Sequence, residues 1–64
     1  MRTEMGLKMS RPVYHYKLVG GGHLHIALEG EQEHCDRIAI EKALEGGYQR
    51  VLRRGERGYR DLPL

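Results

Sequence analysis

Two segments of alternating apolar and polar residues flank three consecutive glycines, and this arrangement constrains the fold more than any other feature. The segments span 13–19 and 23–29, and both are rich in residues that favour strands. A phosphate-binding glycine loop needs a helix after it, whereas a second strand-forming segment follows Gly20, Gly21 and Gly22. The glycines therefore predict the turn of an antiparallel β-hairpin, in which glycine supplies a positive φ.

The alternation also predicts the register of this hairpin. A three-residue loop collects the apolar side chains on one face, whereas a two-residue loop would place Leu18 opposite His23 and mix the faces. The predicted pairs are Tyr14 with Leu28, Tyr16 with Ile26 and Leu18 with Leu24 on the apolar face, and Val19 with His23, Lys17 with His25 and His15 with Ala27 on the other.

Residues 31–45 have the composition and the boundaries of a helix. Glu31 and Glu33 place negative charge in the first turn, where it complements the helix dipole, and Gly46-Gly47 suits the left-handed cap at the end. The apolar residues spread over more than half of the helical wheel, which is more than is needed to cover one sheet. We therefore expect this helix to pack on the hairpin and on a second surface.

Residues 48–54 fit two kinds of secondary structure. Tyr48, Val51 and Leu52 have helical spacing, whereas the preceding Gly-Gly break and the content of this segment suit a short strand. We favour the strand, because a hairpin with one helix is small for an independently stable fold. The predicted fold class is α+β: a β-hairpin packed on one α-helix, with a short third strand in the order ββαβ and a basic C-terminal tail.

The predicted organisation is a single small α+β domain over 12–54, between a flexible leader at 1–11 and a flexible basic tail at 55–64. A chain of 64 residues has room for one domain, and its single cysteine excludes an intrachain disulfide. Folds of this size commonly depend on a disulfide, a metal or a partner subunit. The predicted core comprises Tyr14, Tyr16, Leu18, Leu24, Ile26, Leu28, Cys35, Ile38, Ala39 and Leu44.

Charge is divided unevenly along the chain, although the net charge is only +2. The segment 18–47 is acidic and the segments on both sides of it are basic. Arginines are concentrated in 50–60 and are interleaved with a tyrosine; guanidinium groups suit phosphates, and tyrosine stacks on bases. The predicted nucleic-acid-binding residues are Arg50, Arg53, Arg54, Arg57, Tyr59, Arg60 and Lys17.

The histidines and Cys35 are candidate metal ligands that the predicted fold keeps apart. His23 and His25 point to the open face of the sheet, whereas His34 and Cys35 lie on the helix that covers the other face. We expect no metal and no cofactor within one chain, and a site between subunits is left open. Because no Ser/His/Asp or Cys/His catalytic order is present, we do not expect an enzyme, and Cys35 is expected to be a buried apolar residue.

Two function classes follow from these features. The first is a small nucleic-acid-binding or regulatory protein that contacts the phosphates of DNA or RNA. The second is a homo-oligomeric interaction module, a dimer or higher, that acts as an adaptor or inhibitor of a larger protein and binds no nucleic acid. The sequence has no apolar run of the length that a signal peptide or a membrane span needs, so we expect a soluble, cytoplasmic protein with no membrane partner.

Overall fold

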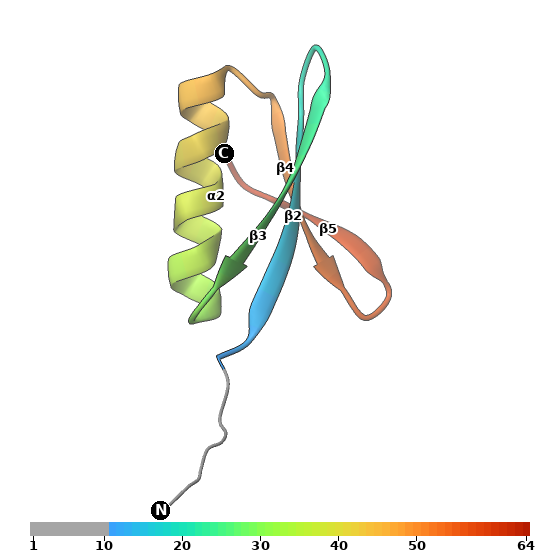
Figure 1. Ribbon diagram of the computed structural model, residues 1–64. Coiled ribbons are helices and arrows are strands. Elements are labelled where there is room, and N and C mark those ends of the chain that lie inside the picture. The colour runs from blue at the N-terminus through green and yellow to red at the C-terminus, as the bar shows by residue number, and fades with distance from the viewer. Residues whose placement is uncertain (1–10) are drawn as a thin grey trace, which may run out of the picture.

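Four antiparallel strands and one helix form the computed structural model, which describes residues 11–64. The strands make one sheet in the order β3-β2-β4-β5, and α2 lies across one face of it (Figure 1). The leader predicted over 1–11 lies outside the described residues, apart from Arg11. Within 11–64, no helix has the length and the apolar character needed to cross a membrane. In chain order the elements are β2 (Val13–Val19), β3 (His23–Glu29), α2 (Gln32–Gly46), β4 (Arg50–Gly55) and β5 (Gly58–Leu62).

The α+β class is confirmed, and the order of the elements over residues 11–64 is ββαββ rather than the predicted ββαβ. The strand interpretation of 48–54 is confirmed by β4. The prediction of a flexible basic tail over 55–64 is wrong, because β5 pairs with β4 along its length. Gly58 has a φ of +108°, a conformation that glycine adopts readily, and it allows the chain to reverse after β4. The folded region thus extends beyond residue 54 to Leu62.

The register predicted for the first hairpin is confirmed at all six predicted pairs, including Tyr16 with Ile26 and Leu18 with Leu24. The reason expected for its glycines is wrong, because none of the three has a positive φ. A Cβ atom on Gly20 would lie 3.2 Å from the Cα atom of Tyr48, so glycine here permits a close approach between two backbones.

The helix begins at Gln32 with Glu31 as its N-cap, one residue after the expected start. It ends at Gly46, one residue after the predicted end, and the predicted left-handed glycine cap is confirmed: Gly47 has a φ of +75°, and its N–H donates to the carbonyls of Ala43 and Leu44. Gly46 has a packing role, because a Cβ atom there would lie 2.7 Å from the Tyr48 ring. The two glycines therefore end the helix and make space for the tyrosine that follows.

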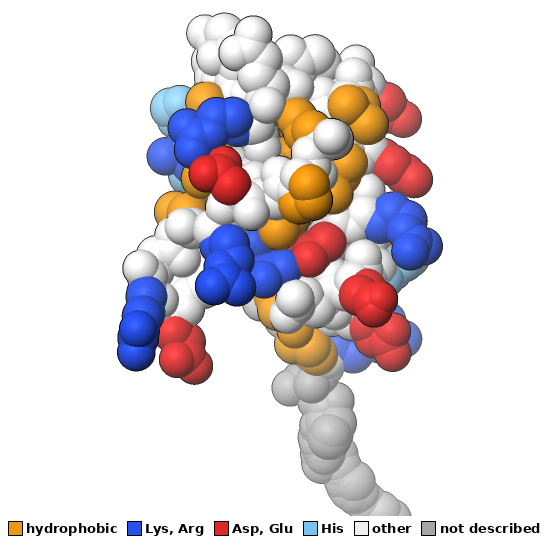
Figure 2. Space-filling view, turned by 180° about the vertical axis from the view of Figure 1, so that it is seen from behind, with side chains coloured by type: hydrophobic (Ala, Val, Ile, Leu, Met, Phe, Trp, Pro, Cys, Tyr) orange, Lys and Arg blue, Asp and Glu red, His pale blue; other side chains and the backbone are white. Residues whose placement is uncertain are grey.

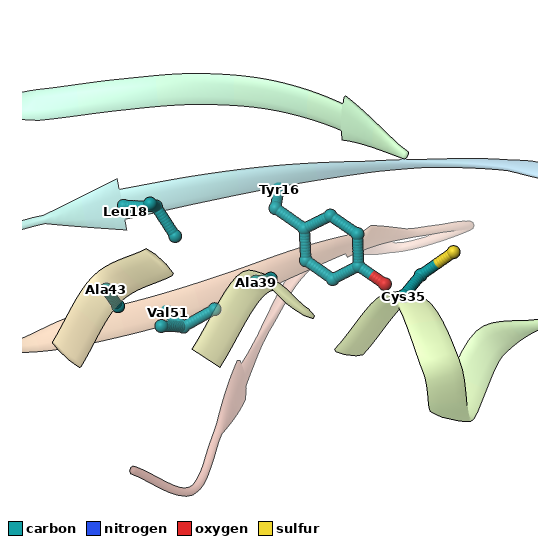
Figure 3. Packing of buried hydrophobic residues seen from close by; sticks show 6 residues of the cluster. All are labelled: Tyr16, Leu18, Cys35, Ala39, Ala43 and Val51. Carbon is teal, nitrogen blue, oxygen red and sulfur yellow. The ribbon is translucent and has the colours of Figure 1, made fainter. Parts of the chain in front are cut away.

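The core lies between α2 and the two central strands (Figure 3). Ala43 and Val51, which were absent from the predicted core, are fully buried. Leu24 and Leu44 were predicted to be buried, but they are 44% and 62% exposed. In each turn of the helix one side chain, such as Ala39 or Ala43, points to the sheet. Leu44 follows Ala43 directly, so its side chain points about 100° away from that direction and is exposed. The buried cluster is Tyr16, Leu18, Cys35, Ala39, Ala43 and Val51.

Candidate nucleic-acid interface

The sheet has one face against α2 and one face that the helix leaves uncovered. Successive side chains of a strand point to opposite faces, and Leu18 and Val51 pack toward the helix. Their neighbours in sequence therefore point away from it. The uncovered face, called the open face below, carries Val13, His15, Lys17, Val19, His23, His25, Ala27, Glu29, Arg50, Leu52, Arg54, Tyr59 and Asp61.

The seven residues predicted to bind nucleic acid are divided between the two faces. Arg53 and Arg60 oppose each other on the face that carries α2, and Arg57 lies in the turn between β4 and β5. The open face brings together the other four predicted residues, which are Lys17, Arg50, Arg54 and Tyr59.

Tyr59 lies at the centre of the basic part of the open face. Its side chain is 42% exposed, and it stands directly opposite Arg54 in the β4–β5 register. The Lys17 Nζ atom, two strands away, lies 5.5 Å from the centre of the Tyr59 ring. That distance is within cation–π range, and Lys17 crosses over the half-buried Leu52 to reach it. An exposed ring thus has one cation over it and a second cationic residue opposite it on the neighbouring strand.

Arg50 is on the open face but is already paired with a carboxylate. Its Nε and Nη2 atoms donate to Asp61 at distances of 3.0–3.1 Å in a bidentate arrangement. The hydrogen bonds from Arg50 to Asp61 raise the pKa of the guanidinium above its usual value. A phosphate at this position would compete with Asp61 for Arg50.

Arg53 connects the sheet to the helix. Its Nη1 atom donates to Asp36 at 2.5 Å, and the Tyr16 hydroxyl donates to the other carboxylate oxygen at 2.6 Å. The Arg53 and Asp36 side chains are only 14% and 20% exposed. The pKa of Tyr16 is raised above its usual value. The larger cause is burial of the ring, and the second is the hydrogen bond to Asp36. Arg53 therefore stabilises the fold and is not available as a free phosphate anchor.

A shallow hollow of about 650 Å³ lies beside the turn of the second hairpin. The hollow is lined by four of the predicted residues, Arg53, Arg57, Tyr59 and Arg60, together with Gly55, Glu56 and Gly58. Lys and Arg side chains gather over the β4–β5 hairpin, whereas acidic side chains follow α2 (Figure 2). The basic surface consequently continues from the open face around the end of the hairpin.

The histidines of the open face lie beside this basic surface. The His23 and His25 rings contact each other edge to face, with 5.4 Å between their centres. His34 and the buried Cys35 are on α2, across the sheet from them. Among residues 11–64, no three His, Cys, Asp or Glu side chains are grouped so as to hold a metal ion.

Comparisons with known proteins give no relative: no protein-family model, no curated protein and no solved structure matches the chain. The interpretation of the open face accordingly rests on its own geometry.

The sequence prediction missed Asp36, Leu52 and Asp61. Asp36 binds Arg53, Leu52 lies opposite Lys17 on the neighbouring strand, and Asp61 binds Arg50. The sequence did contain a signal for the strand that carries Asp61: Gly55 and Gly58 are separated by two residues, which is typical of a hairpin turn. Recognising it would have placed Tyr59 and Asp61 on one face of a strand. The partnership of Asp36 with Arg53 had no such signal, because it joins residues far apart in the sequence.

Proposed function

We propose that the protein binds single-stranded nucleic acid on the open face of its sheet. Exposed aromatic rings on four-stranded sheets stack on the bases of single-stranded RNA in other proteins, and each such contact is worth about 1–3 kcal/mol. The observation that carries the proposal is the exposed Tyr59 ring between Lys17 and Arg54. Because Lys17 lies over one face of the ring, a base stacks on that face only by displacing it, and Lys17 and Arg54 then lie close to the phosphates beside the base.

The distribution of charge supports this choice of face. The four strands and the β4–β5 turn contain six Lys or Arg residues and three Asp or Glu residues. The segment 31–46, which includes α2, contains five acidic residues and two basic ones. A polyanion is therefore attracted to the sheet and repelled by the helix.

The basic residues have different roles in this proposal. Lys17 and Arg54 contact phosphates on the open face, and Arg57 and Arg60 extend the contact into the hollow beside the turn. Arg50 contributes only when a phosphate displaces Asp61. Arg53 is left out, since Asp36 holds it.

Fluorescence anisotropy with labelled, mixed-sequence RNA and DNA strands of about 15 nucleotides tests the proposal. We expect binding that weakens from about 50 to 200 mM salt, because counterions are released when phosphates are contacted. Tyr59→Ala should weaken binding by about tenfold, the equivalent of one lost stacking contact of about 1.4 kcal/mol. The affinities for the RNA strand and for the DNA strand, measured side by side, show which of the two nucleic acids the protein prefers.

Arg37→Ala, an exposed arginine of α2, is the matched control for loss of a positive charge in Lys17→Ala and Arg54→Ala. It should bind like the wild type, because it lies on the helix and away from the open face. The proposal is wrong if no strand binds at low salt, or if Tyr59→Ala and Arg54→Ala behave like Arg37→Ala.

A further inference from the structure

The outer edge of β3 has no partner strand within the described chain. The direction of its backbone groups follows from two hydrogen bonds that continue the β2–β3 register: Gly30 donates to Pro12 at 3.0 Å, and Gly20 to Gly22 at 2.8 Å. Hydrogen-bonded pairs alternate along an antiparallel ladder, so the even-numbered residues of β3 bond to β2. The residues that direct their N–H and C=O groups outward are His23, His25, Ala27 and Glu29.

The side chains of β3 on the helix-bearing face form an apolar stripe that α2 covers incompletely. The helix packs mainly on β2 and β4, the two central strands. Leu24 is 44% exposed in consequence, and Ile26 and Leu28 are half-buried. An apolar stripe beside an unpaired edge is the arrangement that favours pairing with another strand.

We propose that this edge pairs with β3 of a second copy of the protein in an antiparallel arrangement centred on Ile26. The two sheets then become one continuous sheet across a twofold axis. This dimer requires no nucleic acid, and it is independent of the function proposed for the open face.

The sequence of β3 is complementary to itself in this register. Ile26 faces Ile26 of the second copy, and Leu24 faces its Leu28, so the apolar stripes meet on the helix-bearing side. On the open face, His23 faces Glu29 of the second copy at both ends of the pairing. This is the register that pairs all seven residues of β3.

The backbone is complementary in the same register. His25 opposes Ala27 of the second copy, and His23 opposes its Glu29, so the residues with outward groups oppose one another. Each of these pairs can exchange both of its hydrogen bonds. Ile26 and Leu24 then stand in the non-hydrogen-bonded pairs, whose side chains lie closest together.

The other edge of the sheet is less suited to such pairing. β5 is shorter than β3, and its Arg60 places a charge on the helix-bearing face. Pro63 directly follows the strand. Charges and prolines at an edge oppose the addition of another strand, so the second copy is expected at β3.

Size-exclusion chromatography with light scattering tests the dimer through Ala27→Pro. Proline removes an outward N–H and leaves the ladder to β2 intact. We expect the wild type and the control Ala27→Val, which keeps the N–H, to have twice the mass of Ala27→Pro at the same concentration. A monomeric wild type at millimolar concentration, or a dimeric Ala27→Pro, would overturn the proposal.

Disulfide crosslinking tests the register with a second set of variants, in a Cys35→Ala background. Ile26→Cys should crosslink on oxidation, because its Cα atom is expected about 4.5 Å from that of its counterpart, within disulfide range. Leu24→Cys is the control and should not, since its counterpart lies about 14 Å away along the strand. Crosslinking of Leu24→Cys, or its absence in both, contradicts the register.

Discussion

The two hairpins of this protein share one sheet, but they are specified in different ways. The β2–β3 hairpin has a large apolar residue at every second position of both strands, so its own side chains determine its register. The β4–β5 hairpin mixes arginines with apolar residues and has no comparable pattern. Its strands depend on partners: Val51 lies between Leu18 and Leu62, and Arg50 pairs with Asp61. The core is thus shared by the first hairpin, which its own sequence pattern specifies, and the second hairpin, which depends on its partners.

The largest effect on stability is expected at Leu18, which is buried where the two hairpins meet. Leu18→Ala should lower the free energy of unfolding by about 2–5 kcal/mol, because it removes buried methyl groups and leaves a cavity. Leu44→Ala, on the side of α2 that points away from the sheet, should cost much less, since Leu44 is 62% exposed. Urea denaturation followed by circular dichroism measures both. Equal losses would contradict the position of the core.

The connection from the second hairpin to the helix is tested at Asp36. Asp36→Ala leaves Arg53 and the Tyr16 hydroxyl without their shared acceptor. We expect a loss of about 1–3 kcal/mol, since hydrogen bonds to a partly buried charged group are worth about this much. Asp36→Asn keeps an acceptor for Tyr16 and should lose less in the same urea titration. If both variants are as stable as the wild type, Arg53 does not stabilise the fold.

The two turns should respond oppositely to alanine. Gly58→Ala forces a φ of +108° on a residue with a Cβ atom, so we expect a loss of about 1–2 kcal/mol. Gly21→Ala has open space and no positive φ, and it should leave stability unchanged or raise it by about 0.5 kcal/mol. Thermal unfolding separates the two variants. A destabilising Gly21→Ala would show that the first turn needs glycine for another reason.

The smallest expected effect appears at high pH. Burial and the hydrogen bond to Asp36 raise the pKa of Tyr16 in the folded state above the value of 10.0 for a free tyrosine. Above pH 10 the unfolded chain therefore loses this proton first, and the free energy of unfolding falls as the pH rises. Tyr16→Phe should flatten that fall in urea titrations at pH 9–11. Tyr59→Phe, at an exposed ring, serves as the control, and an equal effect in both would contradict the assignment.

The sequence predicted the candidate site only in part. It identified the arginines, but it did not show to which face of the sheet each arginine points. Without β5, nothing in the sequence placed Tyr59 on the same face as Lys17. The ion pairs of Arg53 with Asp36 and of Arg50 with Asp61 were also unpredicted, since each joins residues on different elements. These pairs determine which cations remain available on the surface.

The amino-acid sequence by itself determined the first hairpin, its register and the end of the helix. These features depend on alternation, loop length and a left-handed glycine, and all of them act between residues close in the chain. Only the tertiary structure decided that Leu44 is exposed while Ala43 is buried, and that Arg53 faces the helix. The physical reason is that the orientation of a helix on a sheet and an ion pair between two elements each acquire their energy from partners distant in sequence.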